Sequence, residues 1–247
     1  MEATAAPIDG TVNIPLAELS TRTHELPPRD EVIPVVGSPE LAAQTVAWLA
    51  GHGRRGVVQS EFRFARGACR QIGRLWRPNA LLAEIAPQLQ PGRALDLACG
   101  TGRDAVFLAA CGWTVMAVDI LDDALERGRA LARQCAAAIV PIDWRDVDLE
   151  QGDPTAQLDP PFDLIVGFRY LHRPLLARLA DWLRTGGNVL YETFTTEHRA
   201  RHGKPADDRH VLQPGELRTL LTGLTVRYYS EAWRGNVHTA RIWATRP

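Results

Sequence analysis

The sequence has few cysteines, and their arrangement suggests no metal site. The four cysteines, Cys69, Cys99, Cys111 and Cys135, form no Cys-x-x-Cys pair, and none stands beside a histidine at zinc-ligand spacing. Cys99 and Cys111 lie among apolar residues, which favours packed side chains over reactive thiols. Cys69 lies in a basic stretch that would favour a thiolate, although an ordinary surface cysteine is the simpler interpretation. The sequence therefore predicts no metal.

Long apolar runs and a strong charge of one sign are also missing. No apolar run approaches the ~20 residues of a membrane-spanning helix, and Met1 to Gly10 lacks the basic start and apolar core of a signal peptide. The formal net charge is −1, which gives no general attraction to nucleic acid or to an anionic membrane. These features predict a cytoplasmic enzyme without a membrane partner.

The chain of 247 residues is long enough for a medium α/β domain and a smaller one. Its character changes near Arg54 to Gly67. The first part predicts a short α/β region with helical spacing from Leu16 to Leu26, which ends at two prolines. A buried strand, a helix capped by Ser38 and a short strand are expected next, at Glu31 to Val36, Pro39 to Leu49 and Arg55 to Gln59.

The segment Ile8-Asp-Gly-Thr-Val-Asn-Ile-Pro15, with the helix, strand and helix that follow it up to Gly51-His-Gly53, resembles the rhodanese fold. The resemblance covers residues 1–60 and lacks the opening strand of that fold. In active rhodaneses the loop after this strand begins with a nucleophilic cysteine, but this chain has Gly37 there. The resemblance therefore implies a truncated, inactive unit. An unrelated small α/β appendage is the alternative.

The second part alternates strands and helices, which predicts a parallel sheet covered by helices on both faces. The expected strands are Arg93 to Ala98, Trp113 to Asp119, part of Ala138 to Asp148, Phe162 to Phe168 and Val189 to Phe194. The expected helices are Arg103 to Cys111, Asp122 to Gln134 and Leu175 to Leu183, the last closed by Thr185-Gly-Gly187. Two late strands near Leu224 to Ser230 and Val237 to Thr245 would form a hairpin-like end.

A glycine turn carries the strongest functional signal. Leu95-Asp-Leu-Ala-Cys-Gly-Thr-Gly102 runs from a strand into a helix, and its glycines let the backbone approach a ligand. Taken alone, Gly100 to Ala105 also fits the dinucleotide fingerprint Gly-x-Gly-x-x-Ala. Asp119 follows at about the sequence spacing expected of an acid that binds a ribose. Asp96 helps to decide between a dinucleotide and S-adenosylmethionine. A carboxylate there would repel a pyrophosphate but would favour the cationic sulfonium and amino groups of S-adenosylmethionine.

The pattern from Asp96 to Gly102 resembles motif I of class I S-adenosylmethionine-dependent methyltransferases, and Asp119 resembles their ribose-binding acid. The resemblance implies a seven-stranded Rossmann-like sheet over residues 93–247, with S-adenosyl-L-methionine as cofactor. The implied cofactor-binding residues are Asp96, Ala98, Cys99, Gly100, Thr101, Gly102, Asp119, Ile120, Asp148 and Phe168. Asp143 and Asp146 are further candidates for the adenine-binding acid, although Asp148 matches the family best.

Four further phrases are similar to bacterial class I methyltransferases of the tellurite-resistance type. They are Leu75-Trp-Arg-Pro78, Tyr170-Leu-His-Arg-Pro174, Tyr191-Glu-Thr-Phe-Thr195 and Leu212-Gln-Pro-Gly-Glu-Leu217. The resemblance implies that residues 61–92 contain a linker and a lid, Leu75 to Leu82, that closes over the cofactor.

Acceptors of such folds are expected beyond the carboxyl ends of the strands. The candidate catalytic residues there are His172, Arg173, Arg169, Tyr170 and Glu192, with Tyr191 beside them. Arg169 and Arg173 would hold an anionic acceptor, and His172 would act as a base near neutral pH. Local pairing of Arg173 and a core position for Tyr170 are the structural alternatives.

Together these features predict in-line transfer of a methyl group from S-adenosylmethionine to a small molecule such as a thiol or a chalcogen oxyanion. One alternative is an RNA methyltransferase that binds phosphates through the basic stretches Arg63 to Arg77 and Arg199 to Lys204. The near-neutral charge and the missing Asn-Pro-Pro-Tyr motif argue against nucleic acid as a partner. A non-catalytic S-adenosylmethionine-binding protein is the other alternative.

Overall fold

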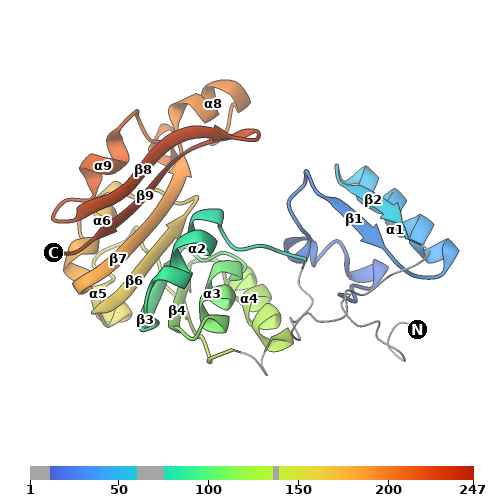
Figure 1. Ribbon diagram of the computed structural model, residues 1–247, viewed down its shortest axis with the longest axis horizontal. Helices are drawn as coiled ribbons and strands as arrows, with labels where there is room; N and C mark the ends of the chain where they lie inside the picture. Colours follow the sequence, from blue (N-terminus) through green and yellow to red (C-terminus); the bar gives the residue numbers. More distant parts are fainter. Residues whose placement is uncertain (1–11, 60–74, 136–138) are drawn as a thin grey trace. The chain divides into compact units, whose positions relative to one another are not determined.

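The computed structural model describes residues 12–59, 75–135 and 139–247. The chain divides into two compact units, Met1–Arg77 and Pro78–Pro247 (Figure 1). Cys69 and most of the basic stretch from Arg63 to Arg77 lie outside the described residues. Among the described residues, no helix has the length and apolar character needed to cross a membrane.

The N-terminal unit contains a two-stranded parallel sheet. Strands β1 (Val32–Val35) and β2 (Arg55–Val58) pair directly and are joined by helix α1 (Pro39–Gly51). All three elements were expected, and Ile33 and Leu49 are buried in the small core that they share. The prediction that the first strand is buried is wrong, because Val32 is exposed and only Ile33 of β1 is buried.

The prediction of a helix from Leu16 to Leu26 is wrong. This segment forms two short 3-10 turns, η2 (Leu16–Glu18) and η3 (Thr23–Glu25). The hydroxyl of Thr21 donates to the carbonyl oxygen of Glu18 at 3.0 Å. Side chains of this kind compete with the backbone for hydrogen bonds, so the first turn is not continued.

The second unit is built on a seven-stranded sheet of order β5-β4-β3-β6-β7-β9-β8. The parallel strands are β3 (Arg93–Leu97), β4 (Thr114–Asp119), β5 (Asp143–Asp146), β6 (Phe162–Phe168) and β7 (Leu183–Phe194). Strands β8 (Thr225–Arg234) and β9 (Val237–Thr245) form an antiparallel hairpin at one edge. The order reverses at β3, which has β4 on one side and β6 on the other. Ligands of open α/β sheets bind outside the carboxyl ends of the strands at such a point.

Helices cover both faces of this sheet, as predicted. Helices α2 (Ala80–Ile85) and α3 (Arg103–Ala110) contribute to one core cluster, with Ala94 and Leu190 from the strands. Helices α6 (Arg173–Leu176), α7 (Leu179–Trp182) and α9 (Glu216–Leu220) contribute to the other, with Leu95 and Tyr191. The remaining helices are α4 (Asp122–Gln134), α5 (Thr155–Leu158) and α8 (Thr196–His202), with the 3-10 turns η4 (Ala86–Gln88) and η6 (Asp208–His210).

Two expectations for this unit need correction. Because Leu81, Leu82 and Ile85 are buried in the core, α2 belongs to the second unit rather than to a linker ending at residue 92. The single helix expected from Leu175 to Leu183 is split into α6 and α7, and Thr185 to Gly187 lies within β7. Arg178 and Trp182 both donate to the hydroxyl of Thr155, which ties α7 to α5 and interrupts the helix.

Candidate active site

The turn between β3 and α3 has a left-handed backbone at several positions, which favours glycine. Gly100 and Gly102 have φ values of +53° and +70°, which glycine adopts without strain. A Cβ atom on Gly102 would lie 2.3 Å from the ring of Trp144. The carboxylate of Asp119, at the end of β4, accepts hydrogen bonds from the N–H of Gly100 at 2.8 Å and the N–H of Leu121 at 3.0 Å. The two predicted motifs therefore meet in space.

A cavity of about 600 Å³ opens at this end of the sheet. Its lining comes from the segments that follow β3, β4, β5 and β6 and from η6. These residues are Ala98, Asp119, Ile120, Val147, Asp148, Leu149, Glu150, Gln151, Tyr170 and His210. Both the volume and the mixture of apolar walls with a few charged groups are typical of small-molecule sites.

The three candidate acids on β5 and directly after it have different surroundings. Asp148 lines the cavity, and its carboxylate accepts the N–H of Glu150 at 2.9 Å. Asp143 and Asp146 are exposed, and Asp143 is paired with Arg145. The geometry thus favours Asp148 among the predicted candidates.

A pair of acids lies beneath the glycine turn. Asp96 is only 2% exposed, and no described residue bonds to its Oδ2 atom. Burial, with the nearby charges of Asp104 and Asp119, raises the pKa of Asp96 well above its ordinary value. Burial also raises the pKa of Asp104 to about 6, although this carboxylate accepts the N–H of Asn79 at 2.6 Å. Arg103 and Arg169 act on the charge of Asp104, whereas of the described charged residues only other acids act on Asp96, so a positively charged ligand beside Asp96 would favour its ionised form.

Sequence reasoning missed Asp104, because an acid in the first turn of a helix is ordinary. The other predicted turn residues are placed as expected, with Thr101 partly exposed and Phe168 partly buried at the end of β6. Burial and the charge of Asp96 raise the pKa of Cys99 well above its ordinary range, which favours a packed thiol over a reactive one.

Tyr170 lies on the cofactor side of the predicted site. It lines the cavity, and its hydroxyl is buried without a hydrogen-bond partner among the described residues. Burial and the charges of Glu150, Asp148 and Asp119 raise its pKa above the ordinary value. Its carbonyl oxygen accepts the hydroxyl of Tyr191, which is fully buried in the core, at 2.8 Å.

Arg173 is held by the fold. Its guanidinium donates to the carboxylate of Glu216 at 2.6 and 3.0 Å and to the carbonyl oxygens of Arg209 and Val211 at 2.9 Å. These contacts favour the local pairing considered above over binding of an acceptor. His172 precedes α6 and does not line the cavity, and its Nδ1 atom is buried without a partner among the described residues.

Glu192 and Arg169 differ in the contacts that their side chains form. Glu192 is 6% exposed, and its carboxylate accepts the side chains of Asn79 at 2.8 Å and Thr239 at 2.6 Å and pairs with Arg241 at 3.0 Å. Arg169 has a φ of +62° and donates its backbone N–H to the carbonyl oxygen of Glu192 at 2.8 Å. Its side chain is exposed and forms no hydrogen bond or ion pair with any residue in the described ranges.

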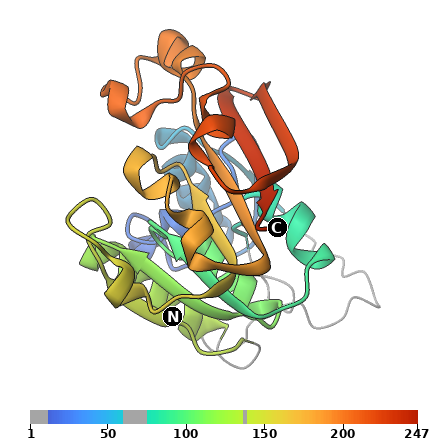
Figure 2. The same ribbon diagram turned by 90° about the vertical axis from the view of Figure 1, so that its left-hand side faces the viewer.

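A cluster of rings lies beyond the end of β7, where Figures 1 and 2 show α8. His198 stacks on Phe194 and lies against His202, each with ring centroids 4.6 Å apart, and Trp233 and His238 complete the cluster. The only sequence signal was the four-residue spacing of His198 and His202, which places both on one helix face. No group of residues in the described part of the chain is arranged to hold a metal ion.

Residues 94–187 match the family described as a methyltransferase domain. This part of the chain is thus similar to methyltransferase domains. Its fold is similar to TehB of Haemophilus influenzae, with 17% identity and a TM-score of 0.55 over 67% of this chain and 61% of that chain. It is also similar to the N-methyltransferase NodS of Bradyrhizobium japonicum, with 20% identity and a TM-score of 0.53 over 68% of this chain and 92% of that chain.

The fold further resembles magnesium protoporphyrin IX methyltransferase of Synechocystis with bound S-adenosylhomocysteine, with 16% identity and a TM-score of 0.52 over 68% of this chain and 80% of that chain. These likenesses confirm the predicted Rossmann-like methyltransferase fold. An uncharacterized protein of Schizosaccharomyces pombe is 23% identical over 86% of this chain and 79% of its own length. That share exceeds residues 78–247, so the likeness reaches into the N-terminal unit.

Proposed function

We propose that this chain is an S-adenosylmethionine-dependent methyltransferase with a small-molecule acceptor. The observation that supports this most directly is the cavity beside the left-handed turn of Gly100 and Gly102, with Asp119 and Asp148 in its wall. Asp119 would hold the ribose hydroxyls, and Asp148 the adenine amino group. The apolar side chains of Ile120 and Leu149 would pack against the adenine.

The buried acids fit the charge of this cofactor. Asp96 has an oxygen without a partner among the described residues, and Asp104 lies close enough to raise its pKa. A sulfonium and an ammonium group would relieve this unfavourable arrangement, whereas the pyrophosphate of a dinucleotide would add further negative charge. The site therefore favours S-adenosylmethionine over NAD.

The bound cofactor would supply an electrophilic methyl group on sulfur. The chain's own contribution would be alignment of the acceptor and exclusion of water, and good alignment can supply ~7–11 kcal/mol of the barrier. Among the predicted acceptor-side residues, Arg169 has a free guanidinium, and His172 stays a candidate base. Tyr170 would border the cofactor, and Arg173 and Glu192 would support the walls through the contacts described above.

We also propose that the N-terminal unit is a truncated rhodanese-like module without chemistry of its own. Its strand, helix and strand have the expected order, and Gly37 occupies the loop between β1 and α1. No nucleophilic cysteine is present at that position.

Calorimetric titration of the full chain with S-adenosylhomocysteine and with NAD tests the proposed cofactor. We expect binding of the first and none of the second. Asp148→Asn should weaken S-adenosylhomocysteine binding, because a charged hydrogen bond contributes ~1.5–3 kcal/mol. The matched variant Asp146→Asn, at an exposed acid on β5, should bind like the wild type. Binding of NAD without a response to S-adenosylhomocysteine would overturn the proposal.

A further inference from the structure

The carboxyl ends of β6 and β7 bring together two side chains that do not line the cofactor cavity. Arg169 follows β6 and is bonded through its N–H to Glu192 of β7. Glu192 and Phe194 share the sheet face of Leu190, since side chains alternate along a strand, and this is the face that α2 and α3 cover. Phe194 stacks on His198 of α8. Arg169 and His198 thus border one region beyond the strand ends.

His198 is a neutral hydrogen-bond donor in this arrangement. The backbone N–H of His238 donates to its Nδ1 atom at 3.3 Å, so the ring proton lies on Nε2. Burial lowers the pKa of His198 below 6.5, and the neighbouring His202, His238 and Arg169 lower it further. No residue in the described ranges accepts a hydrogen bond from Nε2. The ring therefore offers one N–H group at neutral pH.

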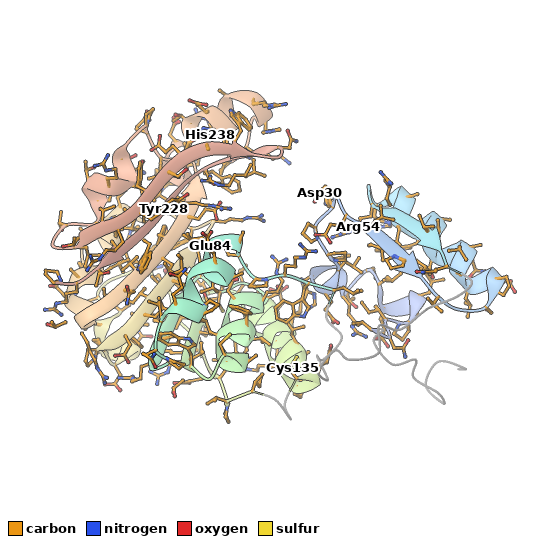
Figure 3. The ribbon with its side chains drawn as sticks, viewed as in Figure 1. Asp30, Arg54, Glu84, Cys135, Tyr228 and His238 are labelled. Atoms are coloured by element: carbon orange, nitrogen blue, oxygen red, sulfur yellow. The ribbon has the colours of Figure 1, made fainter. Side chains whose placement is uncertain are left out.

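His238 is itself fixed, so the position of His198 is well determined. Its Nδ1 atom lies 2.6 Å from the hydroxyl of Thr195, and its Nε2 atom lies 3.3 Å from the carboxylate of Glu197. Figure 3 shows His238 near the end of β9 that lies beside α8. Thr195, which caps α8, and Glu197 in its first turn therefore hold the residue whose backbone orients the ring.

Arg169 brings a positive charge that no carboxylate in the described part of the chain pairs with. Burial lowers the pKa of Arg103, at the start of α3. The charge of Asp104 opposes this shift, and the charge of Arg169 adds to it. Asp104, the acid beside these two arginines, already accepts the N–H of Asn79. The two guanidinium groups thus lie close enough to repel each other, and an anionic ligand beside Arg169 would relieve this repulsion.

We propose that Arg169 and His198 form the subsite that holds a carboxylate, or a similar planar oxyanion, of the methyl acceptor. This inference rests on the proposed function and narrows its substrate class. A guanidinium can donate two parallel hydrogen bonds to a carboxylate, and the Nε2–H of His198 supplies another. Phe194 and Trp233 beside His198 favour an acceptor with an unsaturated, apolar body. His198 would bind the acceptor rather than remove its proton.

The first test measures the pKa of His198 by NMR of its ring protons in the full chain. Arg169→Gln should raise this pKa, because it removes a nearby positive charge. Arg227→Gln, at an exposed arginine on β8, should leave it unchanged. Saturation of the wild type with benzoate should also raise the pKa, because the bound anion favours the protonated ring. An unchanged pKa in Arg169→Gln would show that the two side chains do not share a site.

The second test compares benzoate with its neutral analogue benzamide, both titrated at constant ionic strength into protein saturated with S-adenosylhomocysteine. We expect benzoate to bind at least about tenfold more tightly, and Arg169→Gln and His198→Phe each to weaken it about tenfold, as loss of a charged hydrogen bond predicts. His198→Gln, which keeps a donor, should restore part of the affinity. Equal or absent binding of the two probes would overturn the subsite. Failure to bind S-adenosylhomocysteine would instead contradict the proposed function.

Discussion

Both units of the chain contain a parallel strand that turns into a helix and returns to a neighbouring strand, but the two turns differ. In the N-terminal unit the turn from β1 to α1 contains Gly37, where a Cβ atom would meet nothing within 4 Å. In the second unit the turn from β3 to α3 contains Gly102, with a positive φ and no room for a side chain. Asp119 also holds the second turn through the N–H of Gly100.

Under the proposed function, strand–turn–helix topology alone does not create a ligand site. The site requires a turn whose backbone approaches the ligand and an acid that holds its shape. Some residues at the carboxyl ends of the strands would bind a ligand, and others stabilise the fold. Substitutions at these positions can separate the two roles.

Replacing the two glycines should give the largest contrast. Gly102→Ala places a Cβ atom against Trp144 in a left-handed conformation. We expect a loss of about 2–4 kcal/mol in the free energy of unfolding, together with loss of S-adenosylhomocysteine binding. Gly37→Ala should change stability by less than about 0.5 kcal/mol. Urea unfolding and calorimetry of both variants would measure this, and equal effects would remove the distinction between the turns.

Of the two arginines that follow β6, Arg173 should contribute to the stability of the fold and Arg169 should not. Arg173→Gln loses its pair with Glu216 and its bonds to two carbonyl oxygens, so unfolding should become easier by about 2 kcal/mol. Arg169→Gln should stay within about 0.5 kcal/mol of the wild type. Thermal unfolding of both variants, followed by turnover once an acceptor is known, separates the roles. A stable but inactive Arg173→Gln protein would return Arg173 to the acceptor site.

The buried acid Asp104 should make the stability of the free protein depend on pH. Burial raises its folded pKa from 3.8 to about 6. The folded state therefore binds this proton more tightly than the unfolded state, and stability is lost as the pH rises from about 4 to about 6. Asp104→Asn, which can still accept the N–H of Asn79, should thus be more stable than the wild type at pH 8 by a margin that disappears near pH 4. The measurement is the melting temperature of both proteins across this range, with the exposed Asp123→Asn as control. A constant difference would show that Asp104 carries no such charge penalty.

The N-terminal unit should show no sulfurtransferase activity. Because Gly37 stands where active rhodaneses have a cysteine, we expect no transfer of sulfur from thiosulfate to cyanide. Detectable transfer that persists after replacement of all four cysteines would contradict this interpretation.

The sequence predicted the methyltransferase fold well where periodic patterns were long. Helix α4 and strand β6 have the expected bounds, Asp122–Gln134 and Phe162–Phe168. The short helices were less predictable, because local side-chain bonds such as that of Thr21 decide where a turn stops.

The two halves of the site differ in a similar way. The cofactor half was predictable because its turn is one continuous motif with Asp119 one strand later. The proposed acceptor half was not predictable, because the residues that hold its side chains come from distant parts of the chain. Glu216 pairs with Arg173, and His238 orients His198, in each case across about forty residues. No local pattern in the sequence shows which of two neighbouring arginines has a partner.

The most direct test of the account is the binding of S-adenosylhomocysteine to Asp119→Asn and to Asp123→Asn, measured by calorimetry beside the melting temperature of each protein. Asp119 holds the glycine turn and lines the cavity, whereas Asp123 is an exposed acid paired with Arg127 on α4. We expect Asp119→Asn to lose at least about tenfold in affinity, because a charged acceptor contributes ~1.5–3 kcal/mol per bond. Asp123→Asn should bind like the wild type. Equal affinity in a folded Asp119→Asn protein would contradict the assignment of this cavity to the cofactor.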